Sequence, residues 1–536
     1  MHHKKQYPHS GLIAALIASM VTMAIPVRAV VTERPRLVLG IVVDGLDREY
    51  VEQLMEYFGE GGFKRLSTQG VVIENADFGT PLSSAAATSV IMTGASPSVS
   101  GITADVVFDY GKLMARPVLA DNQTLGNYTT ETYSPVALRV STIGDELKIA
   151  GAGTSLVYSI APDANQAIIL AGHAANNASW LNDDNANWAT TTYYRDVPTV
   201  LSARNRLKGL SLRLDTMQWS PSSVSATCTL VPDPVRHYPF RHVFGRGNEW
   251  RVPMFKNSPL YNTEAISMAS DYVNSLRLGR NDGTDMLALG LSAQPFEYTK
   301  NADARYELVD SYIKLDHDLA SLFDQVDSQI GLKNTLIFLA GTPPRTSTRR
   351  DDPRWRLPYG EYSPKKAKSL LNLYLIALHG NGEWVSAYHG NYFYLNRGLI
   401  KERNLDLTTI QQESADFLKR MSGVLSAYPI GDIIDGHAGE NAEALRRNTD
   451  YSLSGDIMVE IAPGWAIVDV PYNTSTEGGK VVRGVAPFAP IYILAPDVTP
   501  TVIGTPVDAR AIAPTVTRLL RIRSPNGASL PGLRLK

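Results

Sequence analysis

The sequence contains a single cysteine, Cys228, which excludes a disulfide bond within the chain and leaves no cysteine near the start for lipid attachment. It also lacks an excess of positive charge, since 51 lysines and arginines stand against 53 aspartates and glutamates. The densest basic stretch, residues 345–350, is followed directly by two aspartates. We therefore expect no nucleic-acid partner. The 536 residues, 44% of them hydrophobic, can instead bury a large core, with room for one big domain and an inserted one.

Long apolar runs are also scarce, and the N-terminus holds an informative one. Two lysines precede an apolar stretch from Gly11 to Ile25, and residues 27–29 (Val-Arg-Ala) match a small-x-small cleavage site. We expect residues 1–29 to be a signal peptide, and the mature chain to be periplasmic or secreted without a transmembrane segment. A membrane anchor is the alternative, but the stretch is short for a span of about 20 residues and ends at Pro26.

Short apolar runs alternate with segments of helical spacing along the rest of the chain. We predict strands at residues 36–43, 286–291, 336–340, 369–378 and 490–496, and helices at 304–330 and 509–520. This alternation predicts an α/β fold with a mostly parallel sheet covered by helices on both faces. Between 111 and 250 the sequence turns to Asn, Thr, Trp and Tyr in irregular order. We expect an inserted cap region there, with the core formed by residues 33–110 and 251–536.

Several blocks of the sequence resemble the PafA-type alkaline phosphatases, members of a superfamily that also contains the nucleotide pyrophosphatase/phosphodiesterases. These blocks include IVVDGLDREY at 41–50, TSVIMTGASPSVSGI at 88–102, STIGDELKIA at 141–150 and AGHAANNASW at 171–180. The resemblance spans nearly all of the mature chain. It implies an alkaline-phosphatase-like three-layer α/β/α sandwich with an inserted cap, and a phosphoric ester hydrolase site of two zinc ions with a Thr or Ser nucleophile between them.

Two positions of that implied site keep a suitable residue. Asp44, in the context VVDG, resembles the first metal-binding aspartate of the family. Ser84 falls at the position of the nucleophile when counted back nine residues from Thr93, as the spacing in the family suggests. Both residues also fit a structural role, because aspartate and serine commonly cap the first turn of a helix.

The other ligand positions hold residues that are poor replacements. The resemblance puts Ala293 and Glu297 where relatives have an aspartate and a histidine, Gly341 and Thr342 where they have an Asp-His pair, and Glu477 near the last histidine. Alanine and glycine carry no ligating side-chain atom, and a threonine hydroxyl is a poor zinc ligand beside imidazole or carboxylate. A glutamate can bind metal, but a lone exposed one is usually only solvated.

The positions that contact substrate in the family have changed in the same direction. Asp105 stands where the resemblance places an asparagine, and Asp163 and Asn165 stand where it places a Lys-x-Arg pair. An acid and an amide in place of two cations would repel a phosphate dianion rather than hold it. Elsewhere a D-x-x-D-x-H cluster ending at His437 is the best remaining metal candidate, although its spacing matches no common zinc pattern and a solvated loop explains it better.

Two functions are compatible with these residues. In the first, the chain is an exported, metal-free and catalytically inactive member of the superfamily that binds a ligand or serves as a scaffold for a protein partner, neither of which the sequence identifies. In the second, it is an active phosphomonoesterase or phosphodiesterase with a rebuilt site, using one metal, zinc, on Asp44 and Ser84 or another group as the nucleophile. The first is favoured, because one aspartate cannot hold two zinc ions and the loss of most ligands lowers metal affinity strongly.

Overall fold

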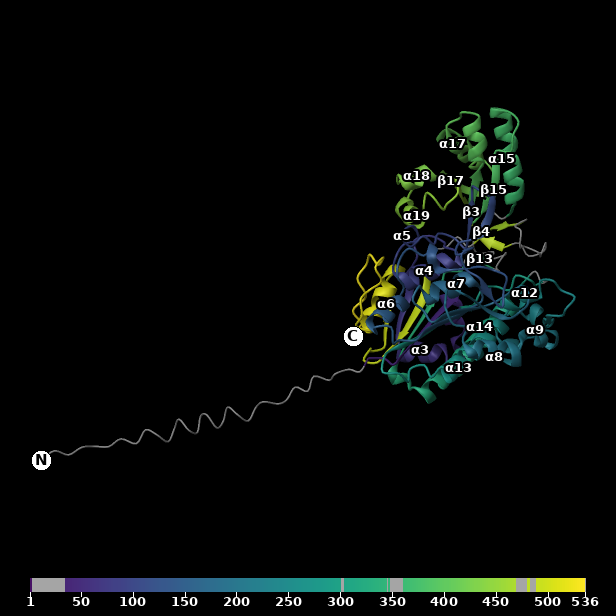
Figure 1. Cartoon of the computed structure of the whole chain (residues 1–536). Helices are drawn as coiled ribbons and strands as arrows, with labels where there is room; N and C mark the ends of the chain where they lie inside the picture. The colour runs from purple at the N-terminus through teal and green to yellow at the C-terminus, as the bar shows by residue number, and fades with distance from the viewer. Residues whose placement is uncertain are drawn as a thin grey trace. The chain divides into compact units, whose positions relative to one another are not determined.

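The computed structural model describes Met1 and residues 34–299, 303–344, 346–347, 360–468, 480–482 and 488–535. Its main feature is a central sheet of eleven strands in these residues (Figure 1), in the order β22-β2-β21-β12-β1-β11-β6-β7-β8-β5, with β23 paired to β2. The strands are β22 Thr501–Ile503, β2 Val71–Asp77, β21 Phe488–Leu494, β12 Thr335–Gly341, β1 Leu37–Asp44, β11 Asp285–Ser292, β6 Val157–Ala161, β7 Asn177–Leu181, β8 Trp188–Thr191, β5 Gly126–Asn127 and β23 Val507–Asp508.

The middle of this sheet is parallel. All pairings from β12 through β1, β11 and β6 to β7 are parallel, whereas β21 runs antiparallel to both β12 and β2. Parallel strands buried on both faces need nearly continuous apolar sequence, and β1 and β12 have it. The prediction of a mostly parallel sheet is confirmed, and four of the five predicted strands are present.

Helices cover both faces of the sheet, because the side chains of each strand alternate between two cores. Leu39 and Ile41 of β1 belong to one core with α2, α3, α13 and α14, whereas Val38 and Val42 belong to the other with α4, α6, α7 and α20. The helices are α2 Arg48–Leu54, α3 Phe63–Gln69, α13 Pro259–Ser275, α14 Arg305–Gln329, α4 Ser84–Thr93, α6 Ile143–Ala150, α7 Ala164–Ala171 and α20 Ile512–Leu519. The three-layer α/β/α arrangement is the one expected, and the predicted helices at 304–330 and 509–520 are α14 and α20.

The segment 111–250, expected as an inserted cap, supplies part of the central sheet. Strands β5, β6, β7 and β8 all come from it, and β6 pairs in parallel with β11. The sequence VYSIA of β6 is buried throughout. A five-residue strand is too short to give a clear periodic signal.

Residues 360–468 form a lobe with its own four-stranded sheet, ordered β15-β16-β18-β17, and its own apolar core. Its elements are α15 Pro364–His379, β15 Val385–His389, β16 Tyr392–Leu395, α16 Arg397–Glu402, α17 Leu407–Leu418, β17 Val424–Pro429, α18 Ile430–Ile434, α19 Ala442–Asn448 and β18 Ile457–Ile461. The hairpin of β3 (Val106–Asp109) and β4 (Met114–Pro117) reaches this lobe, since Tyr110 Oη donates to Asp456 at 2.7 Å.

The prediction of a strand at 369–378 is wrong, because this apolar run lies within helix α15. Ser363 caps the helix by accepting from the amide of Lys366, and Pro364 occupies its first turn. Apolar residues at Ala367, Leu371 and Leu375 then repeat every fourth position and are buried. A run that is apolar at nearly every position hides this helical period. No helix in the described ranges has the length and apolar character required to cross a bilayer.

Candidate functional site

The carboxylate of Asp44 lies at the end of β1 and both of its oxygens accept hydrogen bonds. Thr342 Oγ1 donates to Oδ1 at 2.6 Å, and Gln294 Nε2 donates to Oδ2 at 3.2 Å. The Thr342 hydroxyl in turn accepts from the amide of Gly45 at 3.0 Å. The donors around this aspartate are therefore a hydroxyl and an amide of the protein itself.

Strand order explains why these groups meet. β11 and β12 flank β1 in parallel, so the carboxyl ends of all three strands lie at one edge of the sheet. The pairing continues past the strands, because the amide of Ala293 donates to the carbonyl of Asp44 at 2.8 Å and that of Thr342 to the carbonyl of Val43 at 3.0 Å. Thr342 follows β12 directly and Gln294 lies two residues after the end of β11, so both side chains reach the same carboxylate.

The sequence-predicted ligand positions have different surroundings. Ala293 and Thr342 lie beside Asp44 as expected. Gly341 has little room for a side chain, since a Cβ there would lie 3.0 Å from Leu46 Cβ and 3.1 Å from the carbonyl oxygen of Pro490. The side chain of Glu297 is exposed, and its backbone amide donates to Asn257 Oδ1 at 2.6 Å. Glu477 lies outside the described residues.

Ser84 is the first residue of α4, whose amino end is held by other residues. Ser83 is the N-cap and accepts from the amide of Ala86 at 3.3 Å. Asp105 Oδ1 accepts from the amide of Ala85 at 2.8 Å, and Asn165 Nδ2 donates to the carbonyl of Asp105 at 2.9 Å. An amide at a helix N-terminus is a natural partner for a bound anion, and here a carboxylate of the chain has taken it.

Asp163 adds a further negative group. It caps α7 by accepting from the amide of Gln166 at 3.0 Å. Desolvation by the surrounding protein raises the pKa of Asp163 to about 6, the Gln166 amide and Lys256 oppose the shift, and the negative charges of Asp105 and Asp44 add to it. The residue itself reaches the surface. Two carboxylates from other segments, Asp105 and Asp44, thus disfavour the charged form of Asp163.

The residues of this edge do not fit a pair of zinc ions. In the part of the chain that the structure describes, no group of three His, Cys, Asp or Glu side chains could hold a metal ion. The D-x-x-D-x-H cluster is no exception, since the His437 side chain is exposed and the contact between His437 and Asp432 is a backbone hydrogen bond of 2.7 Å. The nearby cation Lys256 is paired with Asp183.

Sequence reasoning missed Gln294. The resemblance calls for an aspartate at Ala293 and assigns no role to the next residue. The available signal was a polar residue three positions after the predicted strand at 286–291. A hydrogen bond between two side chains 250 positions apart in the sequence becomes visible only in the folded chain.

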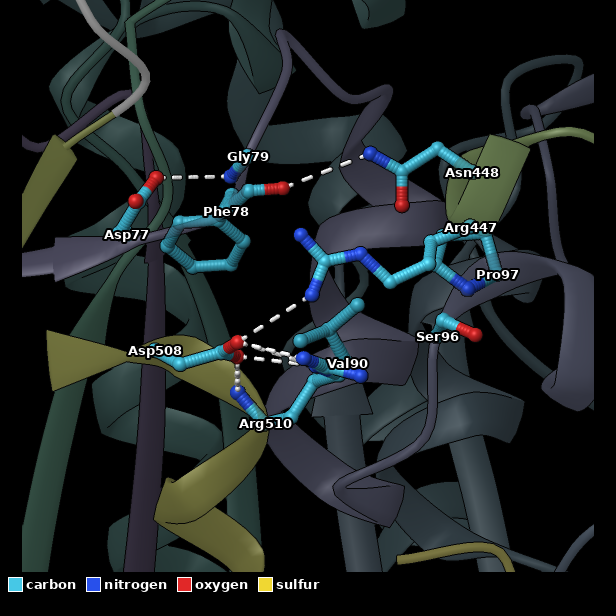
Figure 2. A pocket seen from close by; sticks show the side chains of 10 residues that line it. All are labelled: Asp77, Phe78, Gly79, Val90, Ser96, Pro97, Arg447, Asn448, Asp508 and Arg510. Atoms are coloured by element: carbon cyan, nitrogen blue, oxygen red, sulfur yellow. Dashed lines mark hydrogen bonds and ion pairs between the residues drawn. The ribbon is translucent and has the colours of Figure 1, made fainter. Parts of the chain in front are cut away.

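Figure 2 shows a pocket that lies apart from these residues, lined by Asp77, Phe78, Gly79, Arg447, Asp508 and Arg510 among others. Asp508 makes two-point contact with Arg510, including 2.6 Å to Nη2, and lies 3.6 Å from Arg447 Nη1. Asn448 Nδ2 donates to Thr80 Oγ1 at 2.6 Å. The guanidinium groups thus face a carboxylate of the chain, and the pocket marks a joint between the lobe and the central sheet.

Comparison with known proteins identifies the family of the chain and its fold. The family of type I phosphodiesterases / nucleotide pyrophosphatases matches residues 38–485, so the chain belongs to that family. It is 28% identical to alkaline phosphatase PhoV of Synechococcus elongatus, over 92% of each chain, and 25% identical to alkaline phosphatase PafA of Elizabethkingia meningoseptica, over 97% of each. The crystal structure of wild-type PafA superimposes with a TM-score of 0.80 at 23% identity, over 94% of this chain and 98% of that one. Within the alkaline phosphatase superfamily, the chain is a PafA-type member.

Proposed function

We propose that this chain is a catalytically inactive member of its family that acts as a binding or scaffold protein. The observation that carries the proposal is the hydrogen bonding of Asp44, whose two carboxylate oxygens accept hydrogen bonds from Thr342 and Gln294. A metal ion bound to the remaining lone pairs of this aspartate would find no second carboxylate, imidazole or thiolate among the residues at the adjoining strand ends. Zinc sites need three or four such ligands.

The charges around Ser84 support the same proposal. Asp105 accepts from the helix amide next to Ser84, and Asp163 lies within electrostatic reach of Asp105 and Asp44. Phosphoryl transfer needs cations or metals that neutralise the developing negative charge, whereas this edge offers carboxylates. An uncharged or cationic ligand suits it better than a phosphate ester. We further propose that residues 1–29 direct the chain to the periplasm or the exterior.

The test combines metal content with turnover. Purified mature protein is analysed for bound zinc, and hydrolysis of phosphomonoesters and phosphodiesters is measured for the wild type, Ser84→Ala and the matched neighbour Ser83→Ala. We expect substoichiometric zinc and no turnover above that of the Ser84→Ala variant. Stoichiometric zinc together with turnover that Ser84→Ala abolishes and Ser83→Ala retains would overturn the proposal.

One observation favours the alternative of an active phosphate ester hydrolase. Ser84 keeps a hydroxyl at the amino end of α4, and the relatives at 25–28% identity are named alkaline phosphatases. A helix N-terminus stabilises an anion by about 0.3–1 kcal/mol at an exposed site, which is small beside the contribution of two metal ions. The alternative therefore requires a zinc-dependent signal in the same assay.

A further inference from the structure

Helix α15 carries apolar residues on two faces, although only one face packs against the sheet of the lobe. Ala367, Leu371 and Leu375 are buried in the core of the lobe. Leu370, Leu373 and Leu378 are exposed to 48%, 60% and 49% of their surface. Single exposed leucines are ordinary, but three within nine positions of one helix form a patch that usually marks an interaction site.

The exposed positions follow the helix axis. Lys366, Leu370, Leu373 and Ala377 are exposed and spaced by four, three and four residues, which places them in one stripe along the helix, with Leu378 at its edge. On the flank, Tyr374 stacks on Phe417 of α17 at 4.5 Å between ring centroids, and α15 and α17 lie side by side (Figure 1). Packing within the lobe accounts for the flank and the buried face, but not for the stripe.

The charge of α15 is of one sign. Its 16 residues, PKKAKSLLNLYLIALH, include three lysines in the first two turns and no acid. Three acids on neighbouring elements pair with cations: Glu383 with Lys368 at 3.9 Å, Glu413 with His379 at 2.6 Å and Asp416 with Lys419 at 3.7 Å. Glu361, four positions before Lys365, is exposed and is the acid that faces the lysines along the chain. Lys365 and Lys366 are exposed and make no ion pair within the described ranges. Among the residues that the structure describes, the stripe thus combines exposed leucines with Lys366, which makes no ion pair there, and Lys365 lies next to it.

We propose that α15 docks the chain on an anionic lipid surface, with the leucines at the acyl boundary and the lysines on the headgroups. Leucine on one face and lysine beside it is the pattern of helices that lie in the interface of a bilayer. A second copy of the chain is the less suitable occupant. A stable dimer buries about 800 Å² on each partner, more than a stripe of three leucines can provide. This inference does not depend on the proposed loss of catalysis.

The test measures binding of the full mature protein to vesicles by sedimentation. Vesicles of phosphatidylglycerol mixed with phosphatidylcholine are compared with vesicles of phosphatidylcholine alone. We expect binding to the anionic vesicles that weakens as salt is added, because exposed charges are screened. Lys365→Gln with Lys366→Gln should lower the partition coefficient about 30-fold, since each lysine near the surface contributes about fivefold. Leu370→Gln with Leu373→Gln should lower it by about tenfold.

The matched control is Leu212→Gln, which changes a leucine that is 72% exposed outside the lobe and should leave binding unchanged. All variants replace exposed side chains, so their melting temperatures should equal that of the wild type. Absence of binding to anionic vesicles at low salt would overturn the proposal, as would binding that both double variants retain. A concentration-dependent dimer that Leu370→Gln with Leu373→Gln dissociates, without vesicle binding, would assign the stripe to a second copy instead.

Discussion

Helix α14 and the sheet edge at Asp44 both hold carboxylates that accept hydrogen bonds from the chain, but the acids of α14 are more deeply buried. The side chains of Glu307, Asp310, Asp316 and Asp318 on α14 are buried, with at most 8% of each residue exposed. Asp44 is only partly buried and takes its two side-chain donors from the residues that follow the adjoining strands. The acids of α14 are buried and hold separate segments in place, whereas Asp44 is partly exposed and links the residues that follow β11 and β12 to the end of β1.

Asp310 shows how many donors a buried carboxylate of α14 can hold. It accepts from Trp219 Nε1 at 2.7 Å, from the amide of Ser222 at 2.7 Å and from Ser225 Oγ at 2.8 Å. Asp316 holds another segment through the amides of Gly59 and Phe63, at 2.8 and 2.7 Å. If the acids were removed, these donors would be buried without partners. Their hydrogen bonds therefore explain why these aspartates are buried, and no metal ion is needed to explain it.

The largest effect is expected for Asp310→Ala. The substitution leaves the indole of Trp219 and the donors of residues 222–225 without their acceptor, which should cost about 3–4 kcal/mol in the free energy of unfolding. Urea denaturation followed by tryptophan fluorescence measures it. The control is Asp324→Ala on the same helix, whose exposed pair with Arg65 at 2.9 Å should be worth less than about 1 kcal/mol. Equal losses in the two variants would contradict the anchoring role of Asp310.

A smaller effect that depends on pH is expected at Asp318. Burial raises the pKa of Asp318 to about 6, although a hydrogen bond from Thr263 Oγ1 at 2.7 Å and the charges of His317 and Lys314 oppose the shift. Because the folded state binds the proton more tightly than the unfolded state, this group stabilises the fold fully below the unfolded pKa of about 4. That contribution is lost as the pH rises through about 6.

Asp318→Asn should remove this dependence. The variant should match the wild type at about pH 4 and be more stable by about 2 kcal/mol at about pH 8, because the wild type must then bury a charge. Urea denaturation at the two pH values measures the difference. Asp324→Asn, on the exposed side of the same helix, should show no such divergence with pH. An Asp318→Asn variant whose stability relative to the wild type does not change with pH would show that Asp318 titrates normally.

The same comparison shows what the sequence could predict. The apolar period of α14 and the continuous runs of β1, β11 and β12 predict those elements, and the family resemblance implies that Asp44, Ala293 and Thr342 come together at the strand ends. The donors themselves could not be predicted, because Gln294 reaches Asp44 from 250 positions away. Composition misled at α15. The apolar run of this helix conceals its helical period because its outer face is apolar too.

The smallest effect is expected for Asp44→Asn. The side-chain oxygen of asparagine can still accept from Thr342 Oγ1, and the Gln294 amide can turn so that its oxygen faces the new NH2 group, so the loss should stay below about 0.5 kcal/mol. Thr342→Val, which removes the buried hydroxyl and leaves the amide of Gly45 without its acceptor, should cost about 1–2 kcal/mol. Urea denaturation with and without added zinc measures both. If zinc stabilised the wild type and Asp44→Asn abolished that gain, Asp44 would be a metal ligand. If zinc left all three proteins unchanged, Asp44 would be a local hydrogen-bond acceptor, as its two donors indicate.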